Sequence, residues 1–112
     1  MLKGKIIFAV IFEVEILENK KDEYLKIASM LKEQLVKEKG FVSIERFQSL
    51  VDENKLLSLS FWEGEDAILN WKKNMDHVSA QKKGRESIFK DYKISVAKIN
   101  KSYSLQTSTF DK

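Results

Sequence analysis

Apolar and polar positions alternate through the first part of the chain. Residues 5–17 place every second side chain, from Ile6 to Ile16, on one face, and all of these side chains are apolar. The opposite face is apolar as far as Ile11 and then carries two glutamates. A period of two with β-branched and aromatic residues is typical of a strand. We therefore expect a strand that packs on helices with one face and has its other face partly covered as well.

Helical spacing follows the first strand. Residues 20–39 carry apolar side chains in steps of three and four, which predicts an amphipathic helix. Asn19 or Asp22 could cap its start. Gly40 stands where a left-handed residue would end the helix.

The second half of the chain predicts three further strands and two short helices. Residues 41–50 and 55–62 are expected to form a hairpin, since a polar connection of hairpin length joins them. Short helices are expected to start near residue 65 and at Asn74. The last strand is expected over about residues 87–103, with a bulge where its apolar positions change phase between Val96 and Ala97.

These elements follow the order β-α-β-β-α-β. The order predicts an α+β fold of the ferredoxin-like type, in which an antiparallel sheet has helices on one face only. We expect a single domain over residues 1–104 and a C-terminal tail over residues 105–112. The uncovered face carries Ile7 and Ile11 near its centre, so we expect a second copy of the chain to cover it and form a homodimer.

Composition excludes several classes of function. The chain has 112 residues, no cysteine, one histidine and a formal net charge of +3. A disulfide framework, a thiolate nucleophile and a closed zinc site are therefore excluded, and we expect no metal and a cytoplasmic location. The lysines are scattered beside acids and accompany no nucleic-acid-binding motif. No apolar run approaches the length of a membrane span, so neither nucleic acid nor membrane is an expected partner.

The rarest side chains cluster in residues 60–94, which hold both tryptophans, the only histidine and one of the two arginines. Such a cluster lines either a pocket or a well-packed corner of the core. Several positions in and near it also match a known family. They are Phe41-Val42-Ser43, Glu45-Arg46-Phe47, Ser60-Phe61-Trp62-Glu63, Trp71, His77, Ala80-Gln81, Gly84-Arg85 and Asp91-Tyr92.

On these residues the chain resembles the antibiotic biosynthesis monooxygenase (ABM) family of dimeric α+β barrels over roughly residues 5–103. The resemblance implies a homodimer whose sheets meet face to face, with a pocket between each sheet and its helices. Some members of the family oxidise aromatic polyketides with O2 and no cofactor, whereas others bind and degrade heme. The heme-degrading branch has a histidine ten residues after the tryptophan that Trp71 matches, and here that position is Gln81. It also has an asparagine on the first strand, where this chain has none.

The candidate site residues each have a structural alternative. His77 is the expected acid–base group, because its unperturbed pKa lies near neutrality, and it shares a helix face with Gln81; a surface or capping role is the alternative. Trp71 and Trp62 could line a substrate pocket or pack in the core. Arg46 could bind an anion or pair with an acid. The same alternatives hold for Arg85, and Tyr92 could donate a proton or pack.

We interpret the chain as a cofactor-independent oxidoreductase of the ABM type that acts on a small, flat, aromatic molecule. His77, Arg46 and Gln81 would be catalytic, and Trp71, Trp62, Tyr92 and Arg85 would bind the substrate. Two alternatives stay open. One is a non-catalytic dimer that binds a small molecule, and the other is a heme-binding or heme-degrading protein with His77 as ligand.

Overall fold

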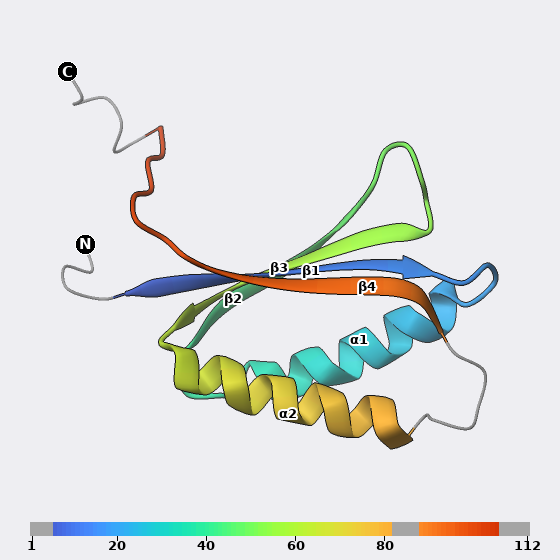
Figure 1. Cartoon of the computed structure of the whole chain (residues 1–112), viewed down its shortest axis with the longest axis horizontal. Coiled ribbons are helices and arrows are strands. Elements are labelled where there is room, and N and C mark those ends of the chain that lie inside the picture. The colour runs from blue at the N-terminus through green and yellow to red at the C-terminus, as the bar shows by residue number, and fades with distance from the viewer. Residues whose placement is uncertain (1–5, 82–87, 106–112) are drawn as a thin grey trace.

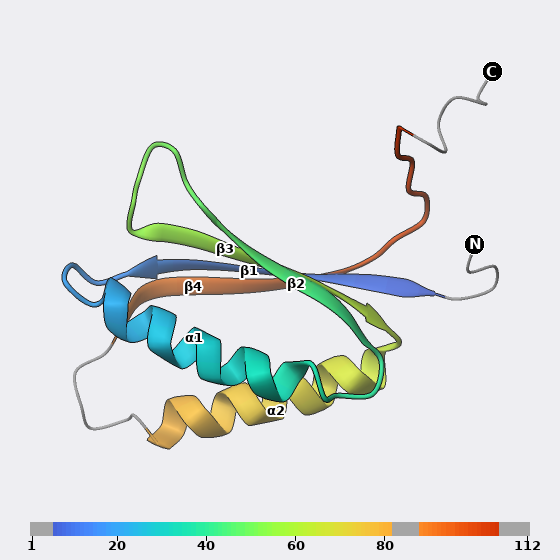
Figure 2. The same cartoon turned by 180° about the vertical axis from the view of Figure 1, so that it is seen from behind.

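The protein is a two-layer α+β structure in which both helices lie under the same face of one sheet (Figures 1 and 2). A computed structural model describes the fold of residues 6–81 and 88–105, and the side chains of these residues other than 74–81. The observed order confirms the predicted ferredoxin-like fold. Its elements are β1 (Ile7–Ile16), α1 (Lys21–Leu35), β2 (Phe41–Gln48), β3 (Lys55–Glu63), α2 (Glu65–Gln81) and β4 (Phe89–Lys98).

The sheet has the strand order β2-β3-β1-β4, and all neighbouring strands are antiparallel. The predicted alternation in β1 is confirmed, because Val10 and Val14 face the helices and are each only 1% exposed. The opposite face is not covered by either helix (Figure 1). Its central residues Ile7 and Ile11 are only half-buried. Among the described residues, no helix is long and apolar enough to cross a membrane.

The second helical region differs from the prediction. It is one continuous helix, α2, and Asn74 lies inside it instead of capping a second helix. No glycine or proline interrupts residues 65–81, and a single asparagine costs a helix only about 0.5 kcal/mol. The capping preference of Asn74, on which the prediction of two helices rested, was therefore too weak a signal to divide the helix.

Three predicted details of helix ends and strand register were wrong. Helix α1 begins after Lys20 without a side-chain cap, because Asn19 takes a left-handed conformation (φ 70°) in the turn before it. The same helix ends at Leu35, before the left-handed Gly40. Strand β4 ends at Lys98, and its register shift lies near its start, opposite Ile16, instead of near Val96.

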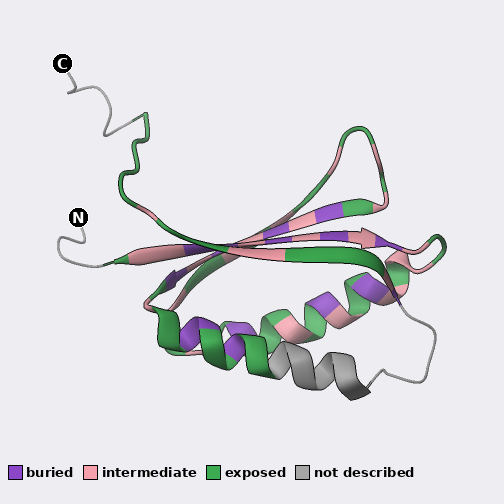
Figure 3. Ribbon diagram, viewed as in Figure 1, coloured by how far each residue is buried: buried purple, intermediate pink, exposed green. Residues whose placement is uncertain are grey.

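The core consists of two separate clusters under the sheet, which correspond to the buried segments in Figure 3. One gathers around β1, the start of α1 and the start of β4; its buried members are Phe12, Val14, Ile16, Tyr24, Ala28, Leu56 and Ile88. The other gathers around the end of α1 and the start of α2; its buried members are Val10, Leu35, Trp62, Ala67, Ile68 and Trp71.

Gly40 joins the turn after α1 to the junction between β3 and α2. Its φ is +91°, and a Cβ placed on it would lie 3.1 Å from the Cβ of Ala67 and 3.2 Å from the carbonyl oxygen of Glu63. Its own carbonyl accepts a hydrogen bond of 2.7 Å from the Glu63 amide. The position therefore requires glycine for two reasons, the backbone conformation and the close approach.

We predict that Gly40→Ala lowers the free energy of unfolding by more than Gly64→Ala does, by about 1 kcal/mol or more. Gly64 also has a positive φ of +106°, but a Cβ there would meet nothing within 4 Å, so its substitution carries the backbone strain alone. Urea denaturation of both variants measures the difference. Equal losses would show that the contact with Ala67 and Glu63 relaxes without cost.

Candidate functional site

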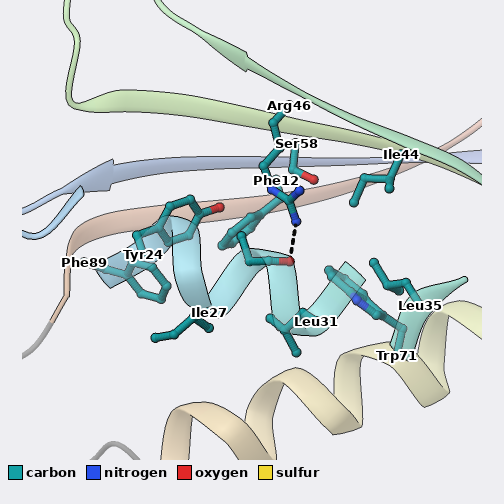
Figure 4. A pocket seen from close by; sticks show the side chains of 11 residues that line it. Phe12, Tyr24, Ile27, Leu31, Leu35, Ile44, Arg46, Ser58, Trp71 and Phe89 are labelled. Atoms are coloured by element: carbon teal, nitrogen blue, oxygen red, sulfur yellow. Dashed lines mark hydrogen bonds between the residues drawn. The ribbon is translucent and has the colours of Figure 1, made fainter. Parts of the chain in front are cut away.

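A cavity lies between the sheet and helix α1, at the boundary between the two core clusters (Figure 4). The volume in its interior that the centre of a water molecule can reach is about 40 Å³. This is more than the roughly 10–15 Å³ that one water molecule needs, and it suits a small polar group. The 11 lining residues are Phe12, Tyr24, Ile27, Ala28, Leu31, Leu35, Ile44, Arg46, Ser58, Trp71 and Phe89.

Strand register explains why two polar side chains face a hydrophobic core here. Arg46 pairs with Ser58 across β2 and β3, and Ser58 pairs with Phe12 across β3 and β1. Paired residues share a face of the sheet, so all three point toward the helices. Ser58 is buried but small, which leaves room beside it for the long arginine side chain.

Arg46 is the charged residue of the cavity wall. Its Nη2 donates a hydrogen bond of 3.2 Å to the backbone carbonyl of Ala28 in α1. Its Nε is buried and has no hydrogen-bond partner in the part of the chain that the structure describes. The guanidinium thus uses one edge to hold the sheet to α1 and keeps a second donor available.

Trp71 supplies a second buried donor without a partner. Its side chain is 7% exposed, and its Nε1 has no acceptor among the described residues. Trp62, whose ring centroid lies 6.1 Å away, differs in this respect, because its Nε1 donates to the Ser60 hydroxyl at 2.9 Å. An unsatisfied buried donor costs about 1–3 kcal/mol, so two in one cavity are unusual in a folded protein.

Tyr24 brings a phenol to the same cavity from α1. It is 5% exposed, and Figure 4 shows its hydroxyl turned toward the Arg46 side of the cavity. Burial raises the pKa of Tyr24 above its ordinary value of 10.0, although the charge and the donors of Arg46 act in the opposite direction. The phenol therefore remains protonated near neutral pH.

Aromatic rings enclose the site at both ends. Phe12 and Phe89 contact each other edge to face with centroids 6.2 Å apart, and Phe89 also contacts Tyr24 at 5.9 Å. At the other end the ring of Trp71 packs against that of Trp62. Apolar walls of this kind lower the local dielectric constant and strengthen any electrostatic interaction inside the cavity.

The structure brings together two of the residues predicted from the sequence, Arg46 and Trp71. Trp62 is fully buried behind Trp71 and does not line this cavity. Tyr92 lies on the edge strand β4, is 54% exposed, and contacts the rings of Phe12 and Phe89 in the cavity wall. His77 and Gln81 belong to α2, but their side chains, like the whole of Arg85, lie outside the described residues.

Tyr24, Ser58, Phe12 and Phe89 line the cavity but were not predicted as site residues. Tyr24 occupied an apolar helical stripe in the sequence, where an aromatic residue is ordinarily part of the core. A signal for Ser58 was present, because it interrupts the apolar face of its strand together with Ser60. Nothing in the sequence showed that Arg46 would lie opposite that serine, since strand register was not known.

Comparison with known proteins identifies related sequences and folds. The family model described as antibiotic biosynthesis monooxygenase matches residues 7–83. The chain is 38% identical over 95 residues to a protein of Pyricularia oryzae named "Jasmonate monooxygenase ABM". That alignment covers 85% of this chain and 44% of the relative, so the chain spans less than half of the length of that protein.

Solved structures show the same fold at low sequence identity. SnoaB of Streptomyces nogalater, described as a cofactor-independent oxygenase, superposes with a TM-score of 0.70 at 10% identity and covers 86% of this chain and 95% of its own. MhuD, crystallised with two manganese protoporphyrin IX molecules per active site, gives a TM-score of 0.66 at 14% identity. It covers 87% of this chain and 98% of its own. At these identities the likeness establishes the fold alone.

The buried phenol of Tyr24 predicts a pH dependence of stability. Because its pKa is raised in the folded state, the folded protein holds this proton more tightly than the unfolded chain does. The resulting stability is fully present below the unfolded pKa and is lost as pH rises toward the folded pKa. Above pH 10.0 the free energy of unfolding should therefore fall more steeply in the wild type than in Tyr24→Phe.

Denaturation at a series of alkaline pH values measures both slopes. Tyr103→Phe, which changes a tyrosine that is 66% exposed, is the matched control and should keep the wild-type slope. A Tyr24→Phe slope equal to that of the wild type would mean that burial does not perturb this phenol.

Proposed function

This chain belongs to the antibiotic biosynthesis monooxygenase family, and we propose that it is an oxidoreductase that adds oxygen to a small, flat, aromatic molecule without a cofactor. The observation that carries the proposal is the cavity lined by Arg46 and Trp71, whose Nε and Nε1 atoms have no acceptor among the described residues. Donors left unpaired in an aromatic cavity suit a ligand with an apolar body and an oxygen acceptor. The similarity to a jasmonate monooxygenase of P. oryzae supports oxidation of a small organic molecule.

In the proposed mechanism the substrate supplies all the electrons. A base removes a proton from a methylene group that lies beside a carbonyl, and the resulting carbanion reacts with O2. Loss of water from the peroxide then leaves a new carbonyl, so that CH2 and O2 become C=O and H2O. Arg46 stabilises the negative oxygen that develops on the substrate, while Trp71 forms an aromatic wall.

His77 is the proposed base, because it is the only imidazole of the chain and follows Trp71 on α2. Gln81, four residues further along α2, would assist in holding the anion. Trp62, Tyr92 and Arg85 remain proposed substrate contacts. A homodimer is also proposed, because the uncovered sheet face presents Ile7 and Ile11, which the helices leave only half-buried.

Heme does not fit the cavity that the described residues form. Its wall contains no histidine, cysteine or methionine among the described residues, so these residues offer no such ligand to a heme iron. Tyr24 is the one lining group with ligating chemistry, and its raised pKa keeps it protonated. The likeness to MhuD therefore supplies no step for this chain.

Binding without turnover is the second candidate function, and the small interior of the cavity favours it. A flat ring can enter only if the lining side chains separate, whereas a small polar group fits as the cavity stands. In that case Arg46 and Trp71 would hold a ligand, and the base would be unnecessary.

We predict that the protein consumes O2 in the presence of indandione, a flat aromatic compound with an acidic methylene group, in buffer with a metal chelator. His77→Ala should lower kcat about a hundredfold or more, as loss of a general base does. Lys73→Ala, an exposed change on the same helix, should leave the rate unchanged. An oxygen electrode follows the reaction, and mass spectrometry identifies the trione product. Indandione binding without oxygen uptake would favour the binding function instead.

A further inference from the structure

We propose that the tip of the hairpin between β2 and β3 is a docking element that packs on a second copy of this chain. The tip consists of Leu50 and Val51, which lie between the end of β2 and the start of β3. The inference rests on the homodimer of the proposed function. It deepens that proposal by naming a surface outside the sheet on which the dimer depends.

Two large aliphatic side chains lie fully in solvent at this tip. Leu50 and Val51 are 103% and 95% exposed, more than any other large apolar residue that the structure describes. A single exposed leucine or valine is ordinary on a protein surface. Two neighbouring ones at the end of a projecting hairpin, with polar residues on either side, form an apolar patch of the kind that marks an interaction site.

Hydrogen bonds hold the tip in this conformation. The Ser49 hydroxyl accepts bonds from the backbone amides of Val51 at 3.1 Å and Asp52 at 3.2 Å. The Asp52 carboxylate accepts one from the Asn54 amide at 2.9 Å, and the Asn54 carbonyl accepts one from the Ile16 amide of β1 at 2.9 Å. The turn is thus fixed to the sheet and holds its apolar side chains away from the protein's own core. A loop that is already ordered loses little conformational entropy when it docks.

The hairpin projects on the side of the sheet that the helices leave uncovered (Figures 1 and 2). Strand register connects its base to that face, because Phe47 pairs with Leu57, and Leu59, two residues further along β3, pairs with Ile11 of β1. These four side chains point to the same face, since strand side chains alternate. The apolar surface therefore runs from the base of the hairpin to the centre of the sheet. A molecule that covers the sheet face would meet the tip as well.

A second copy of the chain is the occupant that the size of this face favours. Four strands of 8 to 10 residues give a flat area of roughly 30 by 19 Å, or about 600 Å². Stable interfaces bury about 800 Å² on each partner, so the sheet face alone is small for a dimer. In a two-fold dimer each copy presents the same face and the same tip, and the two tips add contact area beyond the sheet.

The charges around this surface fit a protein partner better than a membrane. Asp52 and Glu53 directly follow the tip, whereas loops that insert into membranes carry lysine or arginine beside their apolar residues to meet anionic lipids. On the sheet, Glu13 lies next to Leu57 and opposite Lys93 of β4. Burial of the face would therefore leave this carboxylate with a neighbour of opposite charge.

Sedimentation velocity of two double variants tests the inference. Leu50→Gln/Val51→Thr makes the tip polar, and Leu69→Gln/Val36→Thr makes the same two changes in the helical layer, at residues that are 57% and 54% exposed. We expect the wild type to dimerise at micromolar concentration. The tip variant should raise the Kd of the dimer about tenfold or more, because every dimer loses two apolar tips, and the control variant should keep the wild-type Kd. Circular dichroism verifies that both variants fold.

A fluorescent label measures directly whether the tip becomes buried. The chain has no cysteine, so Glu53→Cys accepts one environment-sensitive fluorophore beside the tip and leaves both apolar residues in place. Its emission should shift to shorter wavelength as the concentration rises and the dimer forms. The same label at Lys26→Cys, an exposed position on α1, should show no shift. This measurement decides the matter even if the tip variant does not fold.

Three results would overturn the inference. A wild type that stays monomeric up to about 100 µM would reject the homodimer and the docking tip together. A dimer whose Kd is the same in the tip variant, or whose label at position 53 stays in water, would keep the homodimer and reject the tip. Binding to vesicles of phosphatidylcholine and phosphatidylserine that only the tip variant loses, with the Kd of the dimer unchanged, would assign the tip to a membrane.

Failure of this inference and failure of the proposed activity are distinguishable, because assembly is measured without a substrate. A dimer that depends on the tip but consumes no O2 with indandione would uphold the inference and reject the monooxygenase. Oxygen uptake by a protein whose assembly does not depend on the tip would do the reverse.

Discussion

The antiparallel register of β2, β3 and β1 is the constraint on which the rest of this structure depends. Because strand side chains alternate between faces, the pairing that turns Val10 and Val14 toward the helices also turns Arg46 and Ser58 inward. A slip of one residue would expose the apolar face of β1, so the hydrophobic effect fixes the register that turns the partly buried Arg46 toward the helices. Arg46 and Ser58 lie between the two core clusters, and the cavity is located there. Core and site are thus produced by one and the same register.

The polar residues of the cavity lower the free energy of unfolding. Replacing polar groups that are turned inward by apolar residues of similar volume is often neutral or stabilising, so packing alone does not explain the partly buried Arg46 and the buried Ser58. Two donors that have no acceptor among the described residues add a further cost in the same cavity. Proteins commonly tolerate such costs where a site needs flexibility or unsatisfied groups. Trp62 Nε1 donates a hydrogen bond to a serine hydroxyl, whereas Trp71 Nε1 has no acceptor among the described residues. The unsatisfied donor therefore lies at the cavity and not elsewhere in the core.

The periodicity of the sequence was sufficient to predict the fold, because each strand and helix carries a clear apolar face. It also identified Arg46 and Trp71, since an arginine among apolar strand residues and a tryptophan on a helix are unusual in themselves. It was insufficient for features decided by tertiary contacts. Tyr24 became a site residue only because register placed Arg46 above it. The cap at Asn19, the break at Asn74 and the bulge in β4 were wrong because local preferences of a few tenths of a kcal/mol do not outweigh packing.

Arg46 and Trp71, which line the cavity, belong to the two different layers of the fold. Arg46 projects from β2, whereas Trp71 projects from α2, and α1 is held to the sheet by the bond between Arg46 and the Ala28 carbonyl. A ligand in the cavity would therefore contact the sheet and both helices. The proposed base, His77, lies on the same helix as Trp71, so a substrate that packs on Trp71 would lie beside the helix that carries the base.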